Sequence, residues 1–494
     1  MVMQADVARA NAGTKASVGS KAQAAPGGWK VGFTSLEHEQ IGALDLEVTG
    51  DLPRELAGTL YRIGPSRLDV YGERFRHWFD GDGMIHALSI SDGKVRYQNR
   101  FVETVGKKAE DHARRRIFAS FATRLPGGVL ARWAARNRSK NPANTNIVAH
   151  AGKLLALCEA GRPHRIDPTT LATFGEDDMG GALAPDARYS AHPKLDRATG
   201  EMWNVGSAYA RNATVHVYKT TKDGGTTRVA SVVLPMAAMV HDFALTATKA
   251  VLVIAPIVLP TIPIGILSGQ RSFGESLRWR PELGVRVALV DRATGETTWH
   301  ECDPFMMFHT VNAFDDGADV IVDVAAYPDA RIMTTTVDVM AGTTPTVARA
   351  FVERLRIRAN GRVERTRRSE TPVEFPRVAG RVFGQEHTRV YGVSWPDGMD
   401  FLGEPVMVDL ASGKTERARM APGEYAGECV PVSKRGATSE KDVWILTLVL
   451  DSVARRTELR VLDGADLAAP PVARVALPYV VPFGFHGNWV SQSS

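Results

Sequence analysis

The chain has 494 residues, of which 44% are hydrophobic and 23% are charged, and its formal net charge at pH 7 is +5. This composition is typical of a soluble globular protein with a sizeable core. The positive charge is too modest to indicate a nucleic-acid-binding protein, although it favours contact with an anionic surface such as a layer of lipid headgroups.

The chain carries three cysteines, Cys158, Cys302 and Cys429, and no Cys-x-x-Cys pair. A sparse and odd number argues against a secreted disulfide framework and for a reducing compartment, so we expect a cytoplasmic protein. The first residues lack the charged start and apolar core of a signal peptide. Because residues 1–35 contain little to bury, we predict a disordered tail over 1–35 and a single domain over 36–494.

From about residue 40 onward, short runs rich in Val, Ile, Leu and Tyr alternate with turn sequences. The turns are alike: Asp-Arg-Ala-Thr-Gly-Glu occurs at 196–201 and again at 291–296, Asp-Leu-Ala-Ser-Gly-Lys at 409–414, and Ser-Asp-Gly-Lys at 91–94. Each places a glycine where a hairpin needs a positive φ. So many short antiparallel hairpins predict an all-β fold of radially repeated units, a β-propeller with four-stranded blades.

Two segments depart from this pattern, and we expect them to form a small cap over the top face of the propeller, near 105–140 and 251–280. Within the first, apolar residues four apart among seven arginines predict an amphipathic helical patch over Arg114–Arg138, broken at Pro126-Gly127-Gly128. Such a helix either lies in a membrane interface or packs on the propeller with its arginines in water. Val251–Leu267 contains three prolines, so we interpret it as an apolar loop that favours peripheral membrane contact, not as a transmembrane helix.

Four of the thirteen histidines, His192, His241, His309 and His486, lie in short contexts that read as strand ends near a buried polar centre. In a propeller the innermost strand of each blade lines the axis, so residues far apart in sequence can point at one spot. Imidazole suits iron, copper, zinc and nickel. Four neutral imidazoles would leave a divalent metal its full charge, and an octahedral ion would keep two open positions.

Three glutamates, Glu159, Glu374 and Glu428, lie in strand-like and mostly apolar contexts. A lone buried carboxylate is costly, and a hydrogen bond to the second ring nitrogen of a metal-bound imidazole removes that cost and fixes the tautomer. Spacing alone does not separate these histidines from the structural or surface histidines that are more common.

Several motifs follow one another in a characteristic order over roughly residues 40–490. They are Gly58-Thr-Leu-Tyr-Arg-Ile-Gly-Pro65, His77-Trp-Phe-Asp-Gly-Asp-Gly-Met-Ile-His86, Pro142-Ala-Asn-Thr-Asn146, Ser190-Ala-His-Pro193, His241-Asp-Phe243, Glu374-Phe-Pro-Arg377 and Phe483-Gly-Phe-His-Gly-Asn-Trp489. An ordered set is far more specific than one short motif. The chain resembles the carotenoid cleavage oxygenases, a non-haem iron family that includes apocarotenoid and stilbene cleavage dioxygenases and the retinal isomerase of the pigment epithelium.

The resemblance implies a seven-bladed propeller with a helical cap and an Fe(II) ion held by four histidines. The implied ligands are His192, His241, His309 and His486. Glu159, Glu374 and Glu428 then take the positions behind His241, His309 and His486. Thr145 is expected over a vacant iron position, where it restricts which small molecules bind, and its alternative is an ordinary strand threonine.

The family cleaves a conjugated carbon–carbon double bond with O2 and yields two carbonyl products. Members that cleave phenolic stilbenes carry Lys just before the first of these glutamates and commonly Tyr in the strand after the N-terminal motif. The corresponding residues here are Cys158 and Phe101, and neither stabilises a phenolate. We therefore expect a carotenoid or apocarotenoid substrate, in a tunnel lined by Phe101, Phe308 and Phe485, unless these rings are core residues.

Three alternatives stay open at this point. The nearest is a stilbene- or phenylpropenoid-cleaving dioxygenase that uses other polar residues, and a less favoured one is a retinyl ester isomerase. A different class is a non-catalytic propeller that binds lipids or proteins, since a fold alone does not fix a function. Such a binding scaffold has no need of four histidines and three glutamates.

Overall fold

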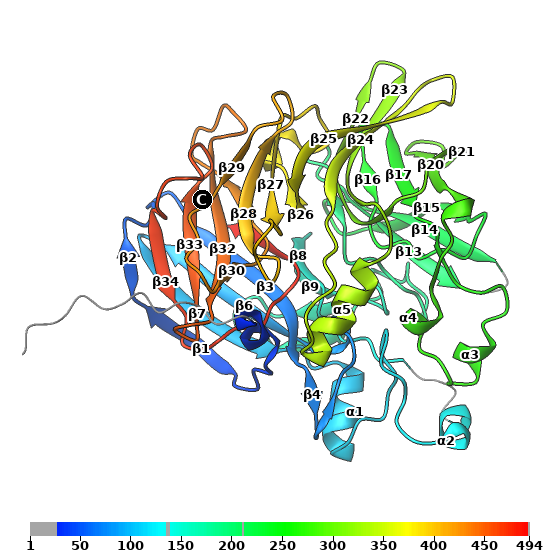
Figure 1. Ribbon diagram of the computed structural model, residues 1–494, viewed down its shortest axis with the longest axis horizontal. Coiled ribbons are helices and arrows are strands. Elements are labelled where there is room, and N and C mark those ends of the chain that lie inside the picture. The colour runs from blue at the N-terminus through cyan, green and yellow to red at the C-terminus, as the bar shows by residue number, and fades with distance from the viewer. Residues whose placement is uncertain (1–26, 135–138, 210–211, 493–494) are drawn as a thin grey trace, which may run out of the picture.

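The computed structural model describes residues 27–134, 139–209 and 212–492. Seven antiparallel sheets surround a central axis as the blades of a β-propeller, which confirms the predicted fold (Figure 1). Most blades have four strands, because the chain turns back on itself in successive hairpins before it passes to the next blade.

The first three blades consist of the following strands: β1 (Gln40–Leu46), β3 (Gly58–Arg67), β6 (Asp82–Ser91), β7 (Lys94–Phe101) and β35 (Gly487–Ser491); β8 (Asn146–His150), β9 (Lys153–Leu157), β10 (His164–Ile166) and β11 (Thr173–Glu176); β12 (Lys194–Leu195), β13 (Met202–Tyr209), β14 (Ala213–Thr220) and β15 (Thr226–Val233). The next two consist of β16 (Ala244–Leu245), β17 (Lys249–Ile254), β20 (Val285–Asp291) and β21 (Thr297–Cys302); β22 (Met306–Asp316), β23 (Asp319–Tyr327), β24 (Phe351–Ile357) and β25 (Val363–Pro372). The last two consist of β26 (Glu374–Arg377), β27 (Arg389–Ser394), β28 (Glu404–Asp409) and β29 (Thr415–Arg417); β2 (Val48–Gly50), β30 (Glu424–Ala426), β31 (Val430–Ser433), β32 (Val443–Asp451), β33 (Arg456–Asp463) and β34 (Ala473–Ala476).

The similar turn sequences form similar turns. The Asp291 side chain accepts hydrogen bonds from the backbone N–H groups of Ala293 and Thr294, and Gly295 follows at φ 76°. The turns that begin at Asp196 and Asp409 repeat this arrangement. An aspartate that holds the backbone two and three residues on, followed by a glycine in the left-handed region, joins two antiparallel strands.

Both ends of the described chain take part in closing the ring. Strand β35, from the C-terminal end, pairs with β3 near the start, and β2 pairs with β34 in the last blade. The first and last blades are thereby joined by backbone hydrogen bonds, not by side-chain packing alone.

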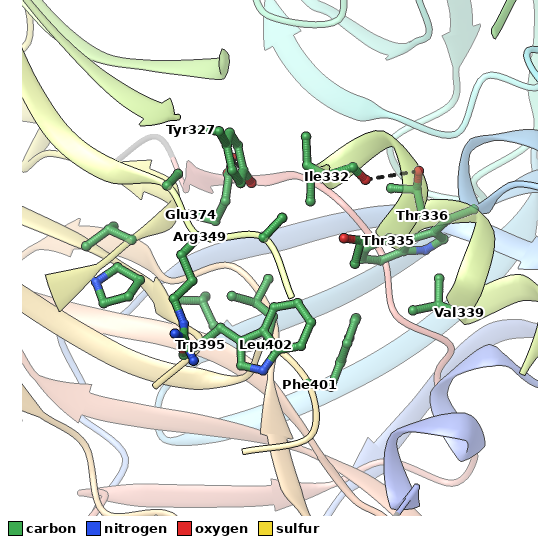
Figure 2. Close-up of a pocket in the computed structure, with 16 residues that line it drawn as sticks. Tyr327, Ile332, Thr335, Thr336, Val339, Arg349, Glu374, Trp395, Phe401 and Leu402 are labelled. Carbon is green, nitrogen blue, oxygen red and sulfur yellow. Dashed lines mark hydrogen bonds between the residues drawn. The ribbon is translucent and has the colours of Figure 1, made fainter. Parts of the chain in front are cut away.

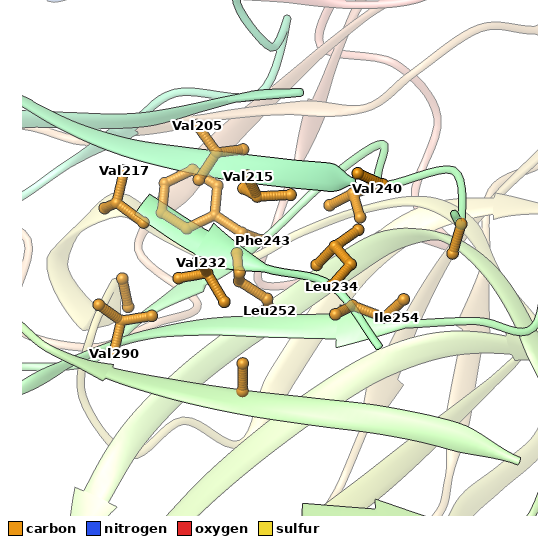
Figure 3. Close-up of a cluster of buried hydrophobic side chains, with 14 of the residues drawn as sticks. Val205, Val215, Val217, Val232, Leu234, Val240, Phe243, Leu252, Ile254 and Val290 are labelled. Carbon is orange, nitrogen blue, oxygen red and sulfur yellow. The ribbon is translucent and has the colours of Figure 1, made fainter. Parts of the chain in front are cut away.

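Each neighbouring pair of blades buries a separate apolar core. Figure 3 shows the one between the third and fourth blades, where Val215 and Val217 of β14 face Leu252 and Ile254 of β17. Corresponding clusters fill the other six interfaces. Strands buried on both faces read as nearly continuous runs of Val, Ile and Leu, as β17 does.

Three insertions gather at one end of the ring and form the cap (Figure 1). The first carries the helices α1 (Val105–Ala113) and α2 (Val129–Ala134). The second carries the helices α3 (Ile264–Leu267) and α4 (Phe273–Ser276), together with β18 (Ile257–Val258), β19 (Arg278–Trp279) and η3 (Pro281–Leu283). The third carries α5 (Ile332–Ala341) and was not predicted. The remaining short elements are β4 (Asp69–Val70), β5 (Glu73–Arg74), η1 (Gly28–Phe33), η2 (Trp78–Asp80) and η4 (Gly380–Val382).

The predicted amphipathic helix over Arg114–Arg138 is wrong in its extent. Helix α1 ends before it, with Arg114 in a left-handed conformation, and only α2 is helical within it among the described residues; 135–138 lie outside them. The Pro126-Gly127-Gly128 sequence and the side chain of Glu110, which accepts the backbone N–H groups of Ile117 and Phe118, hold the intervening chain in an irregular path.

Two other boundaries also need correction. The predicted apolar loop Val251–Leu267 begins as strand β17 and continues through β18, so only its second half belongs to the cap. The predicted tail over 1–35 reaches too far, because Trp29 and Phe33 of η1 are buried against Trp78 and Phe401. Residues 1–26 lie outside the described part of the chain. No helix in the described ranges is long and apolar enough to cross a bilayer.

Candidate metal centre

The four histidines singled out in the sequence lie together on the propeller axis. His192 and His241 directly precede the blade regions that begin with β12 and β16, His309 lies in β22, and His486 directly precedes β35. These strands stand at the inner ends of their sheets. All four histidines are nearly buried: His192, His309 and His486 are between 5% and 7% exposed, and the side chain of His241 is 9% exposed.

The ring nitrogens of the cluster face one another. The Nε2 atoms of His192 and His241 are 2.9 Å apart, and those of His309 and His486 are 3.2 Å apart. Ligand atoms of His192, His309 and His486 all lie within 4.8 Å of one another. Each of these nitrogens can bind a proton or a cation. Their spacing matches that of ligands arranged around a common ion.

Three of the four imidazoles are held from behind by the predicted glutamates. The Nδ1–H group of His241 donates to Oε1 of Glu159 at 2.8 Å, and that of His309 donates to Oε2 of Glu374 at 2.6 Å. The Nδ1–H group of His486 donates to Oε1 of Glu428 at 2.8 Å. A hydrogen atom on Nδ1 leaves the lone pair of Nε2 directed at the centre. No such carboxylate hydrogen bond is recorded for His192 within the described ranges.

The three glutamates differ in what else they bind. Glu374 accepts a second hydrogen bond from the Tyr327 hydroxyl at 2.7 Å. Glu428 is paired with two arginines, Arg62 at 2.5 Å and Arg377 at 2.8 Å. Glu159 has one carboxylate oxygen, Oε2, that is buried and has no hydrogen-bond partner in the described residues. The negative charge behind His486 is therefore balanced by cations, whereas the charges behind His309 and His241 are not.

The electrostatics of the site favour the neutral form of His192 and His486 and the charged form of Glu374 and Glu428. Burial lowers the pKa of His192 well below its usual value and that of His486 to about 4. Burial opposes protonation of His241 too, but the charge of Glu159 outweighs it and raises the pKa of His241. Burial raises the pKa of the Glu428 carboxyl, and Arg377, His486 and Arg62 overcome this and hold it well below its usual value.

A cavity lined mainly by aromatic and aliphatic side chains leads from the cap to the histidines. It encloses about 1560 Å³ of space between protein atoms, its mouth included. Its wall includes Phe79, Phe121, Tyr209, Phe273, Phe308 and Phe485. His241, His309 and His486 lie at its inner end. We call it the cap-side cavity.

A smaller pocket continues the cap-side cavity beneath α5 (Figure 2). Tyr327, Ile332, Thr336 and Glu374 line both spaces, and Trp395 and Phe401 close the far end. Thr336 of α5 is tied to His77 by a hydrogen bond of 2.7 Å to Nε2. The unpredicted third insertion thus completes one wall of the substrate-sized space.

A second large cavity reaches the histidines from the opposite end of the propeller, and we call it the axial cavity. His192, His309 and His486 line it, together with polar residues of the inner strands such as Lys194, Asp242, Arg377 and Asn488. It encloses about 1700 Å³ of space, its mouth included. The histidine cluster therefore separates an apolar space from a polar one.

The structure places most of the predicted site residues at the cap-side cavity. Thr145, Phe308 and Phe485 line it, and the Thr145 hydroxyl donates to Oδ1 of Asn144 at 3.0 Å. Phe101 does not: its ring is buried against Leu36 and Met84, away from the cavity. The tunnel role predicted for Phe101 is therefore wrong, because the side chain points into the packing of the first blade.

Comparisons with known proteins agree with this geometry. Residues 33–491 match the family described as retinal pigment epithelial membrane protein. The chain belongs to this family, that of the carotenoid cleavage oxygenases. As a member of the carotenoid cleavage oxygenase family, the protein is an enzyme of the oxidoreductase class.

Three relatives illustrate the similarity. Apocarotenoid-15,15′-oxygenase from Synechocystis sp. is 32% identical, with 94% of this chain and 96% of that protein covered. Resveratrol cleavage oxygenase 1 from Aspergillus fumigatus is 30% identical, with 90% and 92% covered. The crystal structure of a cobalt-substituted Synechocystis apocarotenoid oxygenase superposes with a TM-score of 0.87 at 31% identity, with 95% and 99% covered.

Sequence reasoning missed four residues that support the centre. Arg62, Phe375 and Arg377 stand inside motifs quoted for the family, but no role was assigned to them. Phe375 has a φ of 49°, which is strained for a non-glycine residue, and its ring lies 5.4 Å from those of both His309 and His486. Tyr327 ends a strand with no distinguishing signal in the sequence.

Proposed function

We propose that this protein is a non-haem iron dioxygenase that cleaves a conjugated carbon–carbon double bond of an apocarotenoid or carotenoid and yields two carbonyl products. One observation carries the proposal. Four imidazoles, three of them bound through Nδ1 to glutamates, face one another, and three of the four lie at the inner end of a long apolar cavity.

The donor set fits ferrous iron. Four nearly buried imidazoles with their Nε2 atoms directed inward match a borderline divalent ion. Among the described residues no thiolate is grouped with them, and the one carboxylate that is, Glu159, is bound to Nδ1 of His241. When bound, iron supplies the activation of O2. The chain's own residues hold the imidazoles, exclude bulk water and place one double bond beside the centre.

Two positions in the wall of the cap-side cavity favour a polyene over a hydroxystilbene. Cys158, in the position expected to carry Lys in phenol-cleaving relatives, lines the cavity, and burial raises the pKa of its thiol to about 12. A neutral thiol is only a weak hydrogen-bond donor and does not offset the charge of a phenolate. The hydroxyl of Tyr327 is already bound to Glu374. A stilbene remains the competing substrate, in view of the fungal resveratrol-cleaving relative.

The experiment combines metal analysis with product identification. Protein purified without added metal is assayed for iron, then incubated aerobically with a panel of apocarotenals, carotenoids and hydroxystilbenes, and the products are identified by mass spectrometry. We expect bound iron and two carbonyl fragments from a polyene. His241→Ala should lose both iron and activity, whereas His216→Ala, on the outer part of its blade, should keep both. Cleavage of stilbenes alone would replace the polyene assignment.

We also propose that the cap touches a membrane surface. Exposed apolar side chains gather on α2 and around α3: Leu130 is 82% exposed, Trp133 69%, Ile262 68% and Leu267 68%. The two helices are neighbours, since a Cβ atom on Gly269 would lie 2.8 Å from Cβ of Arg132. Ile266, between these residues, lines the cap-side cavity. A membrane-dissolved polyene would thus enter next to the surface that holds it.

Co-sedimentation with phosphatidylcholine vesicles, with and without anionic lipid, tests this contact at low and high salt. We expect binding that falls when Leu130 and Trp133 are both replaced by Ser. A matched pair of apolar replacements far from the cap, Val233→Ser and Val453→Ser, both exposed in the wild type, should not change it. The absence of vesicle binding at either salt concentration would refute the membrane proposal and leave the enzymatic one intact.

A further inference from the structure

Most charged side chains at the cap-side cavity have partners that fix their position. Lys140 is fully buried, with Nζ 2.7 Å from Asp82 and 2.8 Å from Glu110. Glu159 and Glu374 are bound to histidines. These groups are committed to holding the cap and the metal centre, so they are not free to bind a substrate.

Arg188 is different. Its guanidinium stacks 5.4 Å from the centre of the Tyr209 ring and 5.9 Å from that of Phe273, and both rings belong to the cavity wall. Within the residues that the structure describes, no carboxylate forms an ion pair with it and no acceptor takes a hydrogen bond from its side chain. The structure does not describe the internal residues 135–138 and 210–211, and neither segment contains an acidic residue that could pair with Arg188.

A half-buried guanidinium held between aromatic rings presents a planar set of N–H donors without an acceptor. Carboxylates match that geometry with two parallel hydrogen bonds, and such charge-assisted pairs are roughly twice as strong as neutral hydrogen bonds. The surroundings offer little competition, because the hydroxyl of Tyr209 already donates to the backbone oxygen of Ala238.

We propose that Arg188 binds a terminal carboxylate of the substrate, so that the preferred substrates are polyene acids. The inference rests on the proposed function and names the end group that it left open. A hydroxyl end offers one weaker hydrogen bond and a hydrocarbon end none, so both bind less tightly than the acid.

The position of Arg188 also ties the end group to the metal centre. Arg188 precedes His192 by four residues, and four extended residues span at most about 14 Å. The Cα atoms of Arg188 and His192 therefore lie within that distance, and a carboxylate held by Arg188 would fix the register of the polyene relative to the histidines. Cleavage is then counted from the acid end, and substrates that differ only at the far end release the same acid-bearing fragment.

Binding tests the assignment without any need for turnover. Metal-free protein is titrated with all-trans-retinoic acid and with all-trans-retinol, and the quenching of tryptophan fluorescence is followed. We expect the wild type to bind the acid at least tenfold more tightly than the alcohol. Arg188→Met should weaken acid binding at least tenfold and change alcohol binding less than twofold, and Arg188→Lys should fall between.

The matched control is Arg115→Met, which removes the same charge from an exposed position in the cap that does not line the cavity. It should bind both ligands as the wild type does. Thermal unfolding of each variant verifies the fold, and Arg188→Lys keeps the test valid if the Met variant unfolds. Equal loss of acid and alcohol binding, or no loss at all, would overturn the assignment.

Turnover of a matched apocarotenoid acid and alcohol separates this inference from the proposed function. If the iron-loaded wild type cleaves the alcohol, and Arg188→Met cleaves the acid as efficiently as the wild type, the Arg188 assignment fails and the dioxygenase stands. If the wild type cleaves no polyene but prefers the acid in binding, the proposed function fails instead.

Discussion

The two cavities that meet at the histidines are built from different parts of the chain. The cap-side cavity is walled by insertions between strands and carries aromatic rings such as Phe121 and Phe273. The axial cavity is walled by the inner strands themselves and carries charged and amide groups such as Lys194 and Asn488. Among the described residues, only His309, Phe375 and His486 are shared by both walls.

This difference assigns the substrate to one side. The hydrocarbon chain of a polyene gains free energy from apolar contact, at about 25 cal/mol for each Å² removed from water, and the cap-side cavity offers that surface. The axial cavity offers solvated polar groups that a polyene would strip of water at a cost. The propeller thus supplies the centre, and the insertions supply the selectivity.

The largest effect is expected where the two cavities meet. His309→Ala removes an imidazole shared by both walls and leaves Glu374 with an unpaired charge in its place. We expect iron content to fall below a tenth of the wild-type value and kcat to fall by at least about a thousandfold, as for removal of a central catalytic group. Metal analysis and single-turnover assays measure the two effects. Wild-type turnover by this variant would refute the common centre.

The two glutamates on opposite sides of the centre give the next comparison. Glu374 faces the cap-side cavity and Glu428 the axial cavity. Glu374→Gln should weaken iron binding by about 10- to 100-fold with little change in stability. Glu428→Gln should do so as well and also lower the free energy of unfolding by about 3 kcal/mol, because Arg62 loses its buried partner. Iron titration and chemical unfolding of both variants measure these quantities, and equal stability of the two would contradict the asymmetry.

A matched pair of alanines tests which cavity holds the substrate. Ala160 lines the cap-side cavity and Ala149 the axial cavity, and both side chains are exposed. Ala160→Phe should lower kcat/KM for a polyene by at least about tenfold, because the new ring occupies the substrate's space. Ala149→Phe should change it less than threefold. Steady-state kinetics decide the matter, and the reverse order would move the substrate to the axial side.

The smallest expected effect concerns the bond between α5 and the propeller. Burial lowers the pKa of His77 to about 3, from an ordinary value of 6.5. The unfolded chain takes up a proton at this residue below about pH 6.5 and the folded chain does not, so stability is lost as the pH falls. At pH 5 the loss is about 2 kcal/mol for this residue.

His77→Gln should remove that part of the pH dependence, and His300→Gln, on the outer strand β21, serves as the control. Urea unfolding at pH 7.5 and pH 5 gives the difference for each protein. A pH dependence that is the same in His77→Gln as in the wild type would show that the cap contact does not depend on a neutral imidazole.

The sequence predicted the repeating parts of the molecule better than the inserted ones. The conformation of hairpin turns such as 291–296 is determined by the local sequence, since an aspartate and a glycine at fixed spacing select one backbone path. The cap follows no such local rule. Helix α1 ends where Arg114 adopts a left-handed conformation, and the path beyond it depends on the distant partner Glu110.

Within the site, the residues identified were those that stand in ordered motifs. Their convergence follows from the fold, because His192 and His486 are far apart in sequence but both lie just before inner strands. Tyr327 and Arg188 could not be found in this way. Their roles depend on which neighbours a blade and a cap loop bring to them, and periodicity carries no information about such contacts. Phe101 failed for the same reason, because strand alternation did not reveal which face meets the cavity.

The pairing of β35 with β3 has a consequence for how the enzyme matures. On the proposed ligand set, a chain synthesised only as far as β34 holds three of the four imidazoles, and the first blade still lacks its inner strand. Ring closure and completion of the metal centre are then the same event. Iron would then bind after translation, once β35 has paired with β3 and closed the propeller. A nascent chain on the ribosome would be unable to retain it.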